Sequence, residues 1–174
     1  CVGPKIDYVA VQTYNGYTGE KMTVVLAKAL LYTHFNKKAE ELALEDYKPG
    51  DKLIPFKVVG EYKGPDLVGM EYEQLIPWVK PVTVDENGKW QEAAGEAFRV
   101  IPGDYVTTED GTGIVHIAPT FGADDAFVAR AAGIPSLFMI NKKGETRPMV
   151  DLTGKFYLLD ELDEAFVKEC VDVE

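Results

Sequence analysis

Short apolar runs separated by Gly, Pro and Asn turns are the feature of this sequence that most limits its fold. Strand-forming residues recur about every 8–12 positions, which is the spacing of sheet-rich domains. The candidate strands are residues 8–14, 22–27, 56–62, 67–72, 82–84, 89–91, 97–101, 113–118 and 138–141. Many short strands with few helices are typical of a closed or nearly closed barrel. The sequence therefore predicts an α+β fold, centred on a β-barrel and decorated by peripheral helices.

Three stretches predict these helices. Residues 27–45 carry Leu and Phe among Ala, Lys and Glu, and Pro49-Gly50 ends the pattern. Residues 122–132 are rich in small residues, and residues 160–171 form the last helical stretch. The strand–helix–strand order from 113 to 141 is compatible with one parallel crossover in a mixed sheet.

Length and charge limit the possible functions. The chain has 174 residues, which predicts one domain spanning residues 1–174. Its 29 acidic residues outnumber 18 basic ones, giving a net charge of −11. Phosphate contacts need positive charge, so autonomous binding of nucleic acid is not expected, although another domain could hold one. No apolar stretch has the length of a membrane span and no signal peptide is recognisable, so no membrane partner is expected.

The cysteines and histidines are too dispersed for a disulfide framework or a metal site. Cys1 and Cys170 stand at opposite ends, and we interpret them as reduced thiols of a cytoplasmic protein. His34 and His116 have no Cys or His cluster around them, so no metal is expected. The chain begins without Met and reaches a strand by Tyr8, as expected of a piece of a longer chain.

The densest group of chemically useful residues lies between positions 109 and 125. His116 stands in an apolar run, and Phe121 and Gly122 lead into a helix whose first turn contains Asp124 and Asp125. A carboxylate at this place could hold an ammonium group through a charge-assisted hydrogen bond. His116 could donate or accept a hydrogen bond near a substrate.

Structural explanations account for the same residues. Acidic residues in the first turn of a helix are favoured by the helix dipole, by about 0.3–1 kcal/mol. A single histidine in a strand can simply be a satisfied core residue. No Ser–His–Asp set can be assembled, and the G-x-G-x-x-G spacing of dinucleotide sites fails here. The residues alone therefore leave both interpretations of Asp124, Asp125 and His116 open.

The same segment resembles a known signature. Residues 111–119 (GTGIVHIAP), followed by Phe121-Gly122 and Asp124-Asp125, resemble the editing-site signature of isoleucyl-tRNA synthetases. Residues 64–73, 97–107 and 147–156 resemble further segments of that family in the same order. The valyl and leucyl enzymes share the Gly-Thr-Gly opening but usually carry Lys and Met at the position of His116. That residue favours the isoleucyl family.

The resemblance implies an insertion, built around a β-barrel, that interrupts the catalytic nucleotide-binding fold. Such a domain hydrolyses valine misattached to tRNA(Ile) and clears valyl-adenylate, because one methylene gives an apolar pocket too little discrimination. By resemblance, Asp125 is the catalytic residue that anchors the α-amino group, and His116 excludes the larger isoleucine side chain. Phe121 and Asp124 are further candidates for substrate binding.

The resemblance also implies the partners. They are the acceptor end of tRNA(Ile), a valine ester or valyl-adenylate, and the rest of the same synthetase chain. It implies no metal and no cofactor in this domain, whereas ATP is used by the synthetic domain of the full-length enzyme.

One departure from the family's pattern bears on activity, and two alternative functions stay open. The threonine-rich segment that lines the opposite wall of the family's pocket lies just before this chain begins, and Thr107-Thr108 is not that element. We therefore expect weak activity or none from these residues in isolation. A non-catalytic module that positions the tRNA acceptor end is one alternative, and the equivalent editing domain of a valyl or leucyl enzyme is another.

Overall fold

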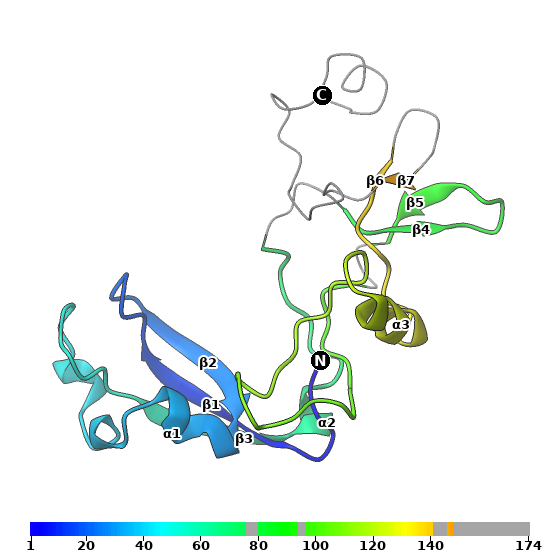
Figure 1. The fold of residues 1–174 in the computed structure, drawn as a ribbon. Coiled ribbons are helices and arrows are strands. Elements are labelled where there is room, and N and C mark those ends of the chain that lie inside the picture. The colour runs from blue at the N-terminus through cyan, green and yellow to red at the C-terminus, as the bar shows by residue number, and fades with distance from the viewer. Residues whose placement is uncertain (76–79, 94–96, 141–145, 148–174) are drawn as a thin grey trace. The chain divides into compact units, whose positions relative to one another are not determined.

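The computed structural model describes residues 1–75, 80–93, 97–140 and 146–147 (Figure 1). The chain divides into two compact units. The first comprises Cys1–Met70 and Val100–His116, and the second comprises the described parts of Glu71–Arg99 and Ile117–Glu174. The single domain expected over residues 1–174 stays a prediction.

A three-stranded antiparallel sheet organises the first unit. β1 (Asp7–Tyr14) is its central strand, with β2 (Lys21–Ala27) on one side and β3 (Lys57–Lys63) on the other (Figure 1). The side chain of Asn15 accepts hydrogen bonds from the backbone N–H groups of Tyr17 and Thr18, which closes the turn between β1 and β2. The strands predicted over residues 8–14 and 22–27 are therefore confirmed, and the side chains of the sheet's central strand, β1, are mostly buried.

The helix predicted over residues 27–45 is wrong. The chain instead forms short turns of helix: Lys28–Leu30, α1 (Leu31–His34), Lys37–Ala39 and Leu44–Asp46. The break after α1 has a physical cause. Phe35 is extended (φ −116°, ψ 133°), and its ring packs against Phe56 with 4.8 Å between ring centroids. Asn36 then caps the next turn by accepting a hydrogen bond from Lys38 N, so core packing and capping override helix propensity.

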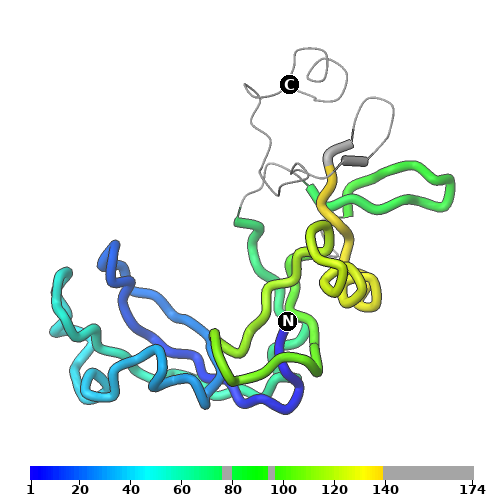
Figure 2. The backbone as a smooth tube through the Cα atoms, viewed as in Figure 1, coloured from blue at the N-terminus to red at the C-terminus, as the bar shows by residue number. Residues whose placement is uncertain are grey.

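Two apolar clusters form the core of the first unit. One gathers side chains from β1, β2, α1 and the segment before β3: Val9, Val11, Leu26, Leu31, Ala39 and Phe56. The other gathers Val2, Tyr8, Ala27, Leu30 and Leu67, the last from α2 (Gly64–Leu67). The first residues of the chain run beside residues 100–116 (Figure 2), where Val2 N donates to Ile101 O at 2.9 Å. Val100 and Ile114 pack against the second cluster, which ties the 100–116 segment to the sheet.

Three of the predicted strands are not strands in the structure. Residues 67–72 begin with the end of α2 and then bend, and Glu71 makes a single bridge with Arg99. Residues 97–101 make that same bridge and no ladder, and residues 113–118 make one bridge, from Ile114 to Val2. The apolar runs at these positions therefore reflect packing on the first unit's core or isolated pairing, not continuous ladders.

The second unit contains two antiparallel pairs and one helix. β4 (Val82–Val84) and β5 (Trp90–Glu92) confirm the strands predicted at 82–84 and 89–91, and β6 (Met139–Ile140) pairs with β7 (Thr146–Arg147). The helix predicted over 122–132 is confirmed as α3 (Ala123–Ala131). The helix expected at 160–171 lies outside the described residues.

The described residues mix a few helices with small antiparallel sheets, which agrees with the α+β class. Among them the sheets do not close into a barrel, so the barrel stays a prediction. Their strand ladders are all antiparallel, and the parallel crossover expected between 113 and 141 is not found there. None of the helices in the described ranges has the length and apolar character needed to cross a membrane.

Candidate functional site

Three consecutive carbonyl groups hold the start of the signature to the first unit. They belong to Gly111, Thr112 and Gly113, which we call the Gly-Thr-Gly segment. The carbonyl of Gly111 lies 2.6 Å from His34 Nε2, that of Thr112 accepts from Ala27 N at 2.8 Å, and that of Gly113 accepts from the Tyr8 hydroxyl at 2.7 Å. The backbone N–H groups of Gly111 and Thr112 have no acceptor within the described part of the chain. The segment is thus fixed through its carbonyl groups, while these two N–H groups have no partner among the described residues.

Tyr8 is fully buried and connects two backbone groups. Its oxygen accepts a hydrogen bond from Gly3 N at 2.8 Å and donates one to Gly113 O. Burial raises the pKa of this hydroxyl above its usual value, while the hydrogen bond from Gly3 acts in the opposite direction. Because burial dominates, Tyr8 remains a neutral donor toward Gly113.

Gly113 has two reasons to be glycine. Its φ of 72° lies in the left-handed region, which other residues rarely adopt. An added Cβ would also lie 2.5 Å from the Cβ of Ala27. The close approach to the end of β2 therefore depends on the missing side chain.

Asp125 lies at the start of α3 and is half-buried. Its Oδ2 accepts a hydrogen bond from Ala118 N at 3.0 Å, which joins the residue to the backbone just before the helix. Among the described residues the carboxylate has no other hydrogen-bond partner. An added Cβ on Gly122 would lie 3.1 Å from Oδ2, so glycine leaves room for this carboxylate. One carboxylate oxygen thus keeps its capacity for a ligand.

The other predicted residues lie in solvent-accessible positions. Asp124 is exposed on α3 beside Asp125, and Phe121, 48% exposed, lies in the turn before the helix, where its N–H donates to Ala118 O. His116 is exposed and is the last residue of the first unit. The structure therefore places Phe121, Asp124 and Asp125 together at one helix start in the second unit. His116 belongs to the first unit.

Sequence reasoning missed three features of this region. Tyr8 and His34 contact the signature from far away in the sequence, and Phe127 on α3 is 75% exposed. The position of Phe127, two residues after Asp125, is visible in the sequence and could have been noticed. The contacts of Tyr8 and His34 could not, because they depend on how the first hairpin folds back.

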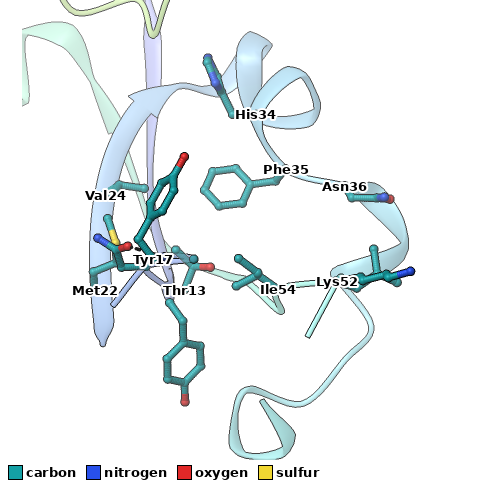
Figure 3. Close-up of a pocket in the computed structure, with 13 residues that line it drawn as sticks. Thr13, Tyr17, Met22, Val24, His34, Phe35, Asn36, Lys52 and Ile54 are labelled. Carbon is teal, nitrogen blue, oxygen red and sulfur yellow. Dashed lines mark hydrogen bonds between the residues drawn. The ribbon is translucent and has the colours of Figure 1, made fainter. Parts of the chain in front are cut away.

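A cavity of about 470 Å³ lies in the first unit. Figure 3 shows Met22 and Val24 of β2 on one side and Asn36 and Lys52 on the other, with Phe35 and Ile54 between them. His34 lies at its border and is the one residue that contacts both this cavity and the Gly-Thr-Gly segment among the described residues. Within the described ranges, no three His, Cys, Asp or Glu side chains gather as metal ligands would.

No model of a known protein family matches the chain. Comparison with curated proteins gives long matches to isoleucine–tRNA ligases. The protein from Bacteroides thetaiotaomicron is 84% identical over 174 residues, which cover all of this chain and 15% of that relative. By sequence, the chain is a segment of the isoleucine–tRNA ligases. The ligase of Porphyromonas gingivalis is 54% identical over 175 residues, covering 99% of the chain and 14% of the relative.

More distant isoleucine–tRNA ligases match as well. The ligase of Treponema denticola is 38% identical over 156 residues, covering 89% of the chain and 13% of the relative. The chain therefore spans about one seventh of the length of these ligases. The family expected from residues 111–125 is confirmed.

Proposed function

We propose that this segment is the hydrolytic editing part of an isoleucine–tRNA ligase, which deacylates valine from tRNA(Ile) and clears valyl-adenylate. One observation carries the proposal. The signature aspartate, Asp125, is half-buried at the start of α3, where one backbone N–H fixes its carboxylate and its second oxygen is without a partner among the described residues.

This arrangement suits the recognition of an ammonium group. The hydrogen bond from Ala118 N restricts the orientation of the carboxylate, so less freedom is lost when a cation binds. A charge-assisted pair between Asp125 and the α-amino group of the amino acid would then hold the scissile ester in one place. Water attacks that ester, the bond between the acyl carbon and the tRNA oxygen breaks, and valine and free tRNA leave.

His116 is proposed as the residue that limits the size of the amino acid side chain. It is exposed at the end of the 111–116 segment, whose backbone is anchored on the first unit. A side chain placed on an anchored backbone can exclude one extra methylene, whereas a mobile one cannot. Phe121 and Asp124 are proposed to contact the same substrate from the start of α3.

The whole ligase is proposed to supply what this segment does not. Its synthetic domain would use ATP to attach isoleucine, the tRNA acceptor end would reach the editing segment, and the enzyme would act in the cytoplasm. A β-barrel completed in the whole chain is proposed as the scaffold. With a net charge of −11, this segment would depend on the rest of the ligase to hold the tRNA.

The test uses the full-length ligase that contains this segment. Asp125→Ala should abolish hydrolysis of Val-tRNA(Ile) while leaving the attachment of isoleucine intact. Asp104→Ala is the matched control, because it removes an exposed carboxylate from the first unit. Unchanged hydrolysis in Asp125→Ala would refute the proposal and favour a module that only positions the tRNA. Hydrolysis of Thr-tRNA(Val) in place of Val-tRNA(Ile) would instead support a valyl-type editing domain.

A further inference from the structure

We propose that His34 and Tyr8 are positioning residues for the editing reaction, acting through the Gly-Thr-Gly segment. This inference rests on the proposed function. Neither residue belongs to the signature, and both reach it from the first quarter of the chain. The sequence separations are 77 residues for His34 to Gly111 and 105 residues for Tyr8 to Gly113.

Three hydrogen-bond donors hold the Gly-Thr-Gly segment. Three donors come from three places: the Tyr8 hydroxyl on β1, the Ala27 N–H at the end of β2, and the His34 ring at the end of α1. Each donor contacts one of the three successive carbonyl oxygens. Three contacts at consecutive residues fix both the path and the rotation of the backbone, which a single contact cannot do. Two of the three come from side chains and can be removed by substitution.

The chemistry of His34 defines what a replacement must provide. A backbone carbonyl only accepts, so Nε2 must carry a proton in this contact, and it does so in one neutral tautomer and in the imidazolium. The amide nitrogen of glutamine can supply a donor at a similar distance from the backbone. His34→Gln should therefore preserve the contact, whereas His34→Ala removes it.

The location of His34 allows an effect on the Gly-Thr-Gly segment to be distinguished from an effect on folding. The side chain is exposed, and it lies at the border of the open cavity shown in Figure 3. Neither core cluster of the first unit includes it. Loss of its ring should thus leave the melting temperature nearly unchanged. Tyr8, by contrast, is buried in the second core cluster, so its substitution tests the same segment with a larger structural risk.

The expected effect is on the chemical step. A displacement of about 1 Å in a residue that aligns reacting groups can cost up to ~100-fold in rate. With two of the three donors left in place, we expect His34→Ala to lower kcat for hydrolysis of Val-tRNA(Ile) by about 5- to 20-fold. KM should remain unchanged, because the tRNA is held mainly elsewhere in the ligase.

The experiment compares four variants of the full-length ligase: His34→Ala, His34→Gln, Tyr8→Phe and Tyr32→Phe. The last is the matched control. It also removes one exposed hydrogen bond from α1, that of the Tyr32 hydroxyl to Glu40 at 2.9 Å, and it does not contact the segment. Hydrolysis of preformed Val-tRNA(Ile), attachment of isoleucine and melting temperature are measured for each.

The inference predicts reduced kcat for hydrolysis in His34→Ala and Tyr8→Phe, restored kcat in His34→Gln, and wild-type behaviour in Tyr32→Phe. Equal hydrolysis by wild type and His34→Ala overturns it, and so does an equal loss in His34→Ala and His34→Gln. Asp125→Ala, measured beside them, distinguishes a failure of the positioning role from a failure of the proposed function. If Asp125→Ala abolishes hydrolysis and the His34 variants do not alter it, only the positioning role fails. If Asp125→Ala retains hydrolysis, the proposed function itself fails.

Discussion

Oδ2 of Asp125 accepts a hydrogen bond from Ala118 N at 3.0 Å, so a side chain of α3 is tied to the backbone that precedes the helix. The bond gives this carboxylate a structural role in addition to the chemical one proposed for it. The two roles can be separated by substitution, because an amide oxygen can accept the same hydrogen bond without carrying a charge.

We expect Asp125→Asn to keep the turn before α3 and to lose most of the hydrolysis of Val-tRNA(Ile). A hydrogen bond to a charged group contributes about 1.5–3 kcal/mol, which corresponds to roughly a 10- to 100-fold lower rate. Deacylation kinetics and the melting temperature of the variant check this. A variant that melts like wild type and hydrolyses at the wild-type rate would show that the charge of Asp125 is not needed.

Replacing His116 should change specificity. In the proposed site the imidazole excludes the larger cognate side chain, so His116→Ala is expected to admit Ile-tRNA(Ile) to hydrolysis. The measurement is release of isoleucine from its own tRNA by the full-length ligase. Tyr32→Phe is the control, since it removes only the exposed hydrogen bond of Tyr32 to Glu40 and should not release isoleucine. Continued rejection of isoleucine by His116→Ala would remove the proposed size-limiting role.

Gly113 and Gly111 form a matched pair for stability. Both have positive φ, 72° and 62°, and a left-handed conformation costs other residues about 1–2 kcal/mol. Only at Gly113 would an added Cβ meet a neighbour, Ala27, whereas Gly111 has open space. Overpacking adds about 1–3 kcal/mol. Urea unfolding of the chain should therefore show a clearly larger loss for Gly113→Ala than for Gly111→Ala, and equal losses would contradict the close packing.

The raised pKa of Tyr8 predicts that this residue contributes to the loss of stability at alkaline pH. Burial raises the pKa of its hydroxyl, so the unfolded chain releases this proton at a lower pH than the folded one. The stability that this group contributes is fully present below about pH 10, the usual tyrosine value, and is lost as pH rises through the folded-state pKa. Tyr8→Phe should make stability depend less steeply on pH in that range. Unfolding free energies of both proteins, measured across alkaline pH, would refute this if the two slopes are the same.

Local signals explain which parts of the fold could be predicted from the sequence. The β1–β2 hairpin has runs of strand-forming residues on either side of a turn containing Asn15, and α3 has small residues between Gly122 and Gly133, so both were predicted within a residue or two. The helix expected over 27–45 failed because Phe35 leaves the helical path to pack on Phe56, a residue distant in the sequence.

The candidate site also has features that could be predicted from the sequence and features that could not. The place of Asp124 and Asp125 in the first turn of a helix follows from local pattern and was predicted. The support of the signature was not, because His34 and Tyr8 meet it only after the hairpin and α1 have folded beside it. Residues 113–118 were expected to be a strand. Their backbone makes one bridge and no ladder, and His116 is exposed. A run of apolar residues cannot distinguish a strand from a segment held by side-chain donors.

The way in which the Gly-Thr-Gly segment is held has a consequence for how it will look in solution. Its carbonyls are occupied, yet the N–H groups of Gly111 and Thr112 have no acceptor in the described part of the chain. Deuterium should therefore enter these two amides quickly, while nuclear relaxation reports an ordered backbone. Rapid exchange is usually taken as a sign of local opening, but here it would accompany a rigid stretch of chain.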